Sequence, residues 1–126
     1  MNDQGEVKFY QPGQEYYFKE GCFINELSNT PGDPAVSIAR ARLEPGNITR
    51  WHFLRETVER YVIVAGSGLV ETGDLPAIQV SAGDVVLIPP GVRQRIGNSG
   101  EDELVFLAIC SPRFQQDNYV DCEEGE

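Results

Sequence analysis

Thirteen glycines and eight prolines interrupt the chain so often that no long segment keeps the periodicity of about 3.6 residues of an amphipathic helix. The segments between them are short and rich in β-branched and aromatic residues, which is typical of strands. Turn sequences such as Gly66-Ser67-Gly68 and Ala82-Gly83-Asp84 separate these segments. We therefore expect an all-β sandwich or barrel. The expected strands are residues 16–18, 22–24, 36–43, 49–54, 59–65, 69–72, 78–80, 85–88, 93–96 and 104–110.

The length of 126 residues suits one domain. We expect a single domain over residues 1–126, with the core barrel at about residues 16–111. The segment at about residues 115–126 ends in several acidic residues and is expected to be a flexible tail. Within this tail, residues 115–120 are the best place for a helix.

The formal net charge of −10 opposes binding to phosphate backbones and anionic lipid, so neither nucleic acid nor a membrane is expected as a partner. No apolar run approaches the ~20 residues of a membrane span. Residues 1–6 lack the pattern of a secretory signal, so a cytoplasmic location is expected. The spacing of Cys22, Cys110 and Cys122 matches neither a disulfide framework nor a zinc finger, and reduced thiols are expected.

Strand alternation singles out two ionisable side chains. Glu59 shares a strand face with Tyr61 and Ile63, and a carboxylate on an apolar face is unfavourable unless it is paired or bound to a cation. His52 is the only histidine, and it shares its face with Arg50 and Leu54. These positions are candidates for a site inside the barrel.

The segment that contains both residues resembles the first motif of the cupin family. This motif consists of a glycine, a His-x-His pair, a glutamate and a second glycine at fixed spacing. Gly46, His52, Glu59 and Gly66 fall on these positions, whereas Leu54 replaces the second histidine.

A later segment resembles the second cupin motif, which consists of a glycine, Pro-x-Gly, a histidine and an asparagine. Gly83, Pro89, Gly91 and Asn98 fall on it, and Gln94 replaces the histidine. All but two of the fixed positions therefore match across the two motifs, in the same order. The resemblance implies a double-stranded β-helix, the jelly-roll barrel of cupins, in an uncharacterised bacterial subgroup of small single-domain members.

In the family, three histidines and a glutamate hold a divalent metal. Carried over, this implies His52, Glu59 and Gln94 as ligands for iron, manganese, zinc or nickel, because Leu54 cannot ligate. The implied function is small-molecule binding inside the barrel, with metal-dependent dioxygenase, isomerase or lyase chemistry on a small oxygenated substrate. Arg42 and Arg50 are candidates for contact with an anionic substrate.

Other expectations stay open at this point. Leu54 and Tyr61 are expected to line the substrate pocket. The alternative to a metal site is a hydrogen-bonded cluster of His52, Glu59 and Gln94 in a metal-free, non-catalytic ligand-binding or sensor protein. Small cupins are often dimers, so the resemblance also implies a homodimer.

Overall fold

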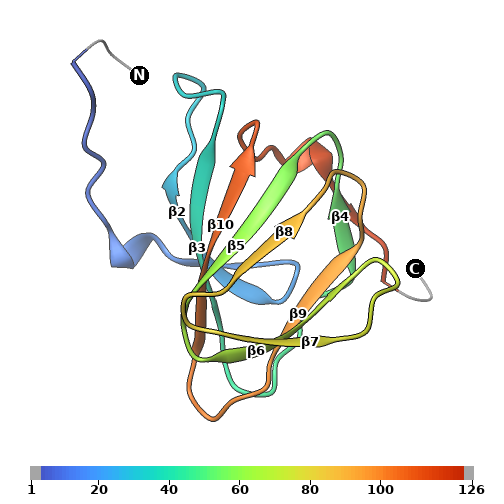
Figure 1. The fold of residues 1–126 in the computed structure, drawn as a ribbon. Coiled ribbons are helices and arrows are strands. Elements are labelled where there is room, and N and C mark those ends of the chain that lie inside the picture. Colours follow the sequence, from blue (N-terminus) through green and yellow to red (C-terminus); the bar gives the residue numbers. More distant parts are fainter. Residues whose placement is uncertain (1–3, 124–126) are drawn as a thin grey trace.

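The computed structural model describes residues 4–123, which form two antiparallel sheets (Figure 1). One sheet contains, in spatial order, β1 (Tyr16–Phe18), β2 (Cys22–Ser28), β3 (Ser37–Leu43), β10 (Leu104–Ser111), β5 (Val58–Ala65) and β8 (Val85–Ile88). The other contains β11 (Tyr119–Asp121), β4 (His52–Leu54), β9 (Gln94–Asn98), β6 (Ser67–Thr72) and β7 (Ile78–Ser81). Two short 3-10 helices complete the described chain, η1 (Pro12–Gln14) and η2 (Gln116–Asn118).

The all-β prediction is confirmed, and each predicted strand overlaps an observed one. The differences are mainly at the ends: β2 continues to Ser28, and β4 begins only at His52. No helix in the described part of the chain is long and apolar enough to cross a membrane.

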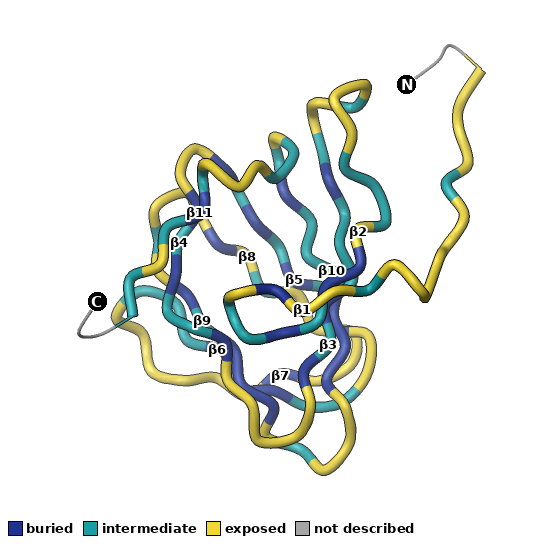
Figure 2. Tube along the Cα trace, turned by 180° about the vertical axis from the view of Figure 1, so that it is seen from behind, coloured by how far each residue is buried: buried dark blue, intermediate teal, exposed yellow. Residues whose placement is uncertain are grey.

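The hydrophobic core lies between the two sheets and is built from alternate residues of the strands. Tyr61 and Ile63 of β5 point inward, and the Tyr61 ring lies 4.4 Å from the ring of Phe106 in β10, measured between centroids. Leu54 and Ile96 contribute from the other sheet. Figure 2 shows buried residues along the strands and exposed residues in many of the connecting loops. The strand faces that enclose the core also carry the polar residues of the site.

A glycine corner joins β5 to β6. Gly66 has a φ of +84°, and a Cβ atom at this position would lie 2.4 Å from the carbonyl oxygen of Glu103. Both the left-handed backbone and the close approach of the neighbouring loop require glycine here. The corner lets the chain leave one sheet and enter the other.

The segment from residue 115 differs from the prediction. The expected helix at residues 115–120 is wrong, because only η2 forms before the chain becomes β11 and pairs with β4. The Tyr119 ring packs edge-on against Phe18 at 5.4 Å between centroids, and the Cys122 amide donates to the Trp51 carbonyl at 2.9 Å. The described part of the expected tail is therefore held against the barrel, and residues 124–126 lie outside the described residues.

Candidate functional site

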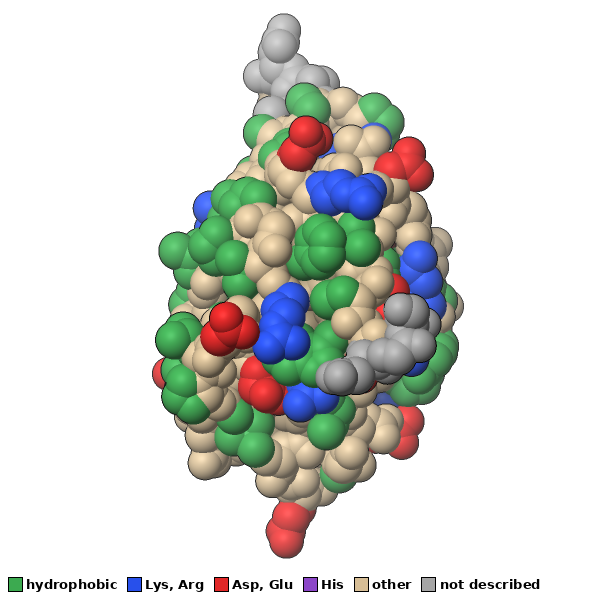
Figure 3. Space-filling view, turned by 90° about the vertical axis from the view of Figure 1, so that its right-hand side faces the viewer, with side chains coloured by type: hydrophobic (Ala, Val, Ile, Leu, Met, Phe, Trp, Pro, Cys, Tyr) green, Lys and Arg blue, Asp and Glu red, His purple; other side chains and the backbone are tan. Residues whose placement is uncertain are grey.

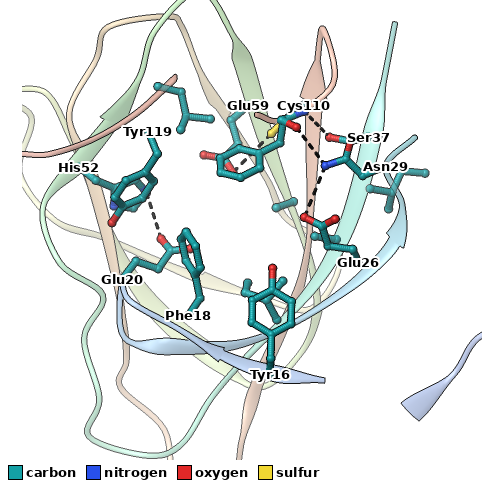
Figure 4. Close-up of a pocket in the computed structure, with 16 residues that line it drawn as sticks. Tyr16, Phe18, Glu20, Glu26, Asn29, Ser37, His52, Glu59, Cys110 and Tyr119 are labelled. Atoms are coloured by element: carbon teal, nitrogen blue, oxygen red, sulfur yellow. Dashed lines mark hydrogen bonds and ion pairs between the residues drawn. The ribbon is translucent and has the colours of Figure 1, made fainter. Parts of the chain in front are cut away.

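A cavity opens between β1, β2 and the inner faces of both sheets (Figure 4). Its cavity volume is about 50 Å³, so the cavity is narrow and opens to solvent at one side. Apolar and aromatic side chains form most of its wall, which is usual for a small-molecule site. The ionisable residues that line it are Glu20, Glu26, His52, Glu59, Cys110 and the tyrosines Tyr16 and Tyr119.

His52 is held on one side of the cavity by contacts to both ring nitrogens. Its Nδ1 lies 2.7 Å from the carbonyl oxygen of Arg50, and its Nε2 lies 3.1 Å from Oε2 of Glu20. Because a carbonyl oxygen can only accept, Nδ1 must carry a proton and donate it. The other contact then also needs a proton between Nε2 and the carboxylate, since two acceptors cannot form a hydrogen bond. We call these two side chains, which form an ion pair when the imidazole is protonated, the Glu20–His52 pair.

The position of Glu20 follows from the turn between β1 and β2. The Gly21 amide donates to the Phe18 carbonyl at 2.9 Å, which closes the turn, and the Arg50 amide donates to the Glu20 carbonyl at 2.7 Å. This second bond joins the turn to the residues that precede β4. The Tyr119 ring also stacks on the imidazole of His52, with 5.0 Å between centroids and 18° between planes. Glu20 is a site residue that the motif spacing does not reveal.

Glu59 lies on the inner face of β5, on another side of the cavity from the Glu20–His52 pair (Figure 4). Its side chain is buried, its Oε1 has no hydrogen-bond partner, and its Oε2 accepts a weak bond from the Cys110 thiol at 3.8 Å. Burial, followed by the nearby charge of Glu20, raises the pKa of Glu59 to about 7. His52, followed by the side chains of Gln94 and Cys110, lowers the pKa, but by less.

Gln94 and Tyr61 form a second layer beside the cavity. Gln94 is the register partner of His52 across β4 and β9, and the Tyr61 hydroxyl donates to its Oε1. Both side chains are buried, and neither lines the cavity. The amide oxygen that was predicted to be a metal ligand is therefore already engaged by Tyr61.

The donor set of this site does not fit the metal centre implied by the motifs. Nε2 of His52 is engaged by Glu20, Leu54 presents an apolar side chain to the cavity, and the oxygen of Gln94 is engaged by Tyr61. Within residues 4–123, no three His, Cys, Asp or Glu side chains converge in a way that could hold one metal ion. His52 and Glu59 line one cavity, and their role as metal ligands stays a prediction.

The predicted substrate-binding residues are divided between the cavity and the surface. Leu54 lines the cavity, and Tyr61 lies behind it. Arg42 points outward from β3, where Glu15 and Glu103 pair with its guanidinium, and Arg50 pairs with Asp121 at 2.5 Å. Neither arginine lines the cavity, and the expected contact of either one with a substrate stays a prediction.

Other arginines also lie on the outer surface. The guanidinium carbons of Arg93 and Arg95 lie 4.3 and 4.5 Å from the centroid of the Trp51 ring, on the side of the second sheet that faces away from His52. Figure 3 shows Lys and Arg side chains next to hydrophobic ones on the right-hand side of the molecule as drawn in Figure 1. The positive charge of the chain is therefore placed mainly outside the barrel.

Comparisons with known proteins support the barrel and its family. The sequence model of the cupin domain matches residues 39–110, more than half of the chain. An uncharacterized protein of Methanocaldococcus jannaschii is 31% identical over 111 residues, covering 86% of this chain and 88% of that protein. Oxalate decarboxylase of Bacillus subtilis is 27% identical over 114 residues, which cover 86% of this chain but only 29% of the enzyme. Among solved structures, the Streptomyces nucleoside dehydratase Pac13 has a TM-score of 0.75 at 18% identity, covering 94% of this chain and 92% of its own.

Proposed function

This chain belongs to the cupin domain family, and the cavity described above lies inside its barrel. We propose that the chain binds a small molecule in this cavity and transfers protons between its own side chains and the bound molecule. The reaction type that we propose is that of a lyase or isomerase. The observation that carries the proposal is the buried Oε1 of Glu59, which has no partner and lines the same cavity as the Glu20–His52 pair. A buried acceptor without a partner is unfavourable unless a ligand satisfies it.

The two groups are suited to opposite halves of an acid–base reaction. With its pKa near 7, Glu59 is present both as acid and as base around neutral pH, which is the condition for efficient proton transfer. Both members of the Glu20–His52 pair line the cavity, and when the imidazole is protonated the proton on Nε2 lies between them. In an elimination, ionised Glu59 takes a carbon-bound proton next to a carbonyl group. The pair donates its proton to the leaving hydroxyl, which departs as water, and solvent then restores both groups.

Two relatives support this reaction class by their names, since a decarboxylase and a dehydratase both remove a small group from their substrate. The substrates of these two proteins are not inferred for this chain, because their sequences are only 27% and 18% identical to it. The metal-dependent version of the function has less support from the side chains, because the histidines expected at positions 54 and 94 are Leu54 and Gln94.

The proposal is tested with a panel of small β-hydroxy carbonyl compounds, with NMR in D₂O to follow carbon-bound proton exchange and product formation. We expect Glu59→Gln and Glu20→Gln each to lower the rate by about 10²-fold or more, which is the usual contribution of general acid–base catalysis. Glu101→Gln, at an exposed loop position, is the matched control and should keep the full rate.

Elemental analysis and a chelator distinguish the metal-free function from the metal-dependent alternative. We expect no stoichiometric metal and no loss of rate with chelator. A stoichiometric metal that disappears in His52→Ala, together with loss of the rate, would instead establish the metal-dependent function. Ligand binding without exchange or turnover on any compound would establish the non-catalytic alternative.

A further inference from the structure

We propose that the cavity recognises a small organic cation, namely a protonated amine, and disfavours organic anions. The inference rests on the proposed use of this cavity as the ligand site and names the chemical class of the ligand. It comes from the charges, the unpartnered polar atoms and the aromatic rings of the wall.

The charged side chains of the wall are mainly carboxylates. Glu20, Glu26 and Glu59 line the cavity with His52, and among the described residues that line it there is no lysine or arginine. The Glu20–His52 pair is close to neutral as a unit when the imidazole is protonated. Buried Glu59 and, at the exposed mouth, Glu26 remain as a net acidic contribution, and a potential of this sign attracts cations and repels anions.

The cations nearest to the cavity do not reverse this balance. Arg113 lies beside the mouth, where its Nη1 donates to Oδ1 of Asn29 at 2.9 Å, next to Glu26 and Asp117 in an adjoining pocket. Lys19 is exposed, and its ammonium lies over the rings of Tyr119 and Phe18. Neither side chain lines the cavity itself.

Unpartnered polar atoms indicate which kind of hydrogen-bonding group is missing. Glu59 is only 8% exposed, and its Oε1 atom has no hydrogen-bond partner. An ionised carboxylate only accepts, so its partner must donate, and an ammonium offers three donors and no acceptor. A ligand carboxylate would face the ionised form of Glu59 with acceptors alone. The hydroxyl of Tyr119, at the same wall, is also buried without a partner.

Aromatic rings form part of the remaining wall, beside aliphatic side chains, and are suited to the same ligand. Phe18 packs edge-on against Tyr16, Phe114 and Tyr119, with 5.4 to 6.4 Å between ring centroids. The negative face of an aromatic ring attracts ammonium groups. The ammonium of Lys19 lies 4.9 Å from the centroid of Tyr119, so one ring of this wall already has an ammonium over it. Rings together with carboxylates are the usual recognition chemistry for organic cations.

Three probes of the same length test the inference: propylamine as its hydrochloride, sodium propionate and 1-propanol. Binding to the full chain is measured at neutral pH from NMR chemical-shift changes. We expect propylammonium to bind at least about tenfold more tightly than either other probe, and the difference to shrink as salt is added.

Variants connect this preference to the cavity. Glu59→Gln and, at the mouth, Glu26→Gln should each weaken propylammonium binding several-fold without strengthening that of propanol, while the exposed-loop control Glu101→Gln leaves it unchanged. Using two variants keeps the test valid if one of them does not fold. Equal or tighter binding of propionate, equal binding of propanol, or no binding of the amine up to about 100 mM would overturn the inference.

The inference and the proposed function fail separately. If propionate binds best but Glu59→Gln still abolishes turnover, the ligand class is wrong and the acid–base function stands. If the amine binds as expected but no compound shows proton exchange that depends on Glu59, the ligand class stands and the catalytic proposal fails.

Discussion

Single residues at this site differ in how well the sequence predicts them. His52 and Glu59 are found from their spacing, because the motif fixes the strand faces on which they lie, and both line the cavity. Gln94 occupies a motif position, yet its oxygen is engaged by Tyr61. Glu20 has no motif, and it meets His52 through a turn and a backbone bond between segments that are distant in the sequence. Such a contact depends on the tertiary structure and leaves no spacing pattern.

The burial of Glu59 predicts a specific dependence of stability on pH. Its pKa rises from 4.5 to about 7 on folding, so between these values the folded chain binds a proton that the unfolded chain has lost. The stabilisation is therefore fully present below the unfolded pKa and is lost as the pH rises through the folded pKa, with an amplitude on the order of 3 kcal/mol.

Replacing Glu59 by glutamine should remove this dependence, because the amide does not ionise. We expect Glu59→Gln to flatten the decline in the free energy of unfolding between about pH 5 and about pH 8, and to be the more stable protein at the upper end. Urea unfolding at several pH values measures this, with Glu101→Gln as the exposed control. An unchanged slope in Glu59→Gln would show that the carboxyl is not buried in its ionised form.

At the scale of elements, strands and corners were predictable where the pattern is local. Period-two alternation marks β5 and β10, and glycine marks the corner at Gly66. β11 was missed because it is only three residues long, and its pairing with β4 depends on Tyr119 packing against Phe18. A strand that is defined by its contacts with distant residues has no signal of its own.

The Gly66 corner gives a test with an internal control. Gly66 and Gly83 both have positive φ, +84° and +95°, but a Cβ at Gly83 would meet nothing within 4 Å, whereas at Gly66 it would meet the Glu103 carbonyl oxygen. We expect Gly83→Ala to lower the free energy of unfolding by about 1 kcal/mol through backbone strain, and Gly66→Ala by at least about 2 kcal/mol more. Urea unfolding measures both, and equal losses would rule out the close approach at Gly66.

At the scale of the whole molecule, we propose that two copies associate through the outer face of β5 and β8. Val64, Val85 and Leu87 are more than half exposed there, and Val62 is the register partner of Val85. Adjacent exposed aliphatic side chains on a sheet are a common feature of association surfaces. A second copy would cover them with a surface of the same composition.

Sedimentation tests the association. We expect the chain to sediment at twice its monomer mass of 14.0 kDa, and Leu87→Lys to give a folded monomer. Ile78→Lys, at an exposed position of β7 in the other sheet, should leave the dimer intact. A monomeric parent chain, or a Leu87→Lys variant that remains dimeric, would contradict the proposed interface.

The stacking of Tyr119 on His52 has a consequence for when the cavity is completed during folding. The imidazole is flanked by a turn near residue 20 and by a ring about one hundred positions later. The contact with Tyr119 spans more than half of the chain, and contacts of such large sequence separation are typical of slowly folding β proteins. A polypeptide that ends before Tyr119 would keep its histidine and its glutamates but would lack one wall of the cavity, so we expect the cavity to be complete only after β11 has paired with β4.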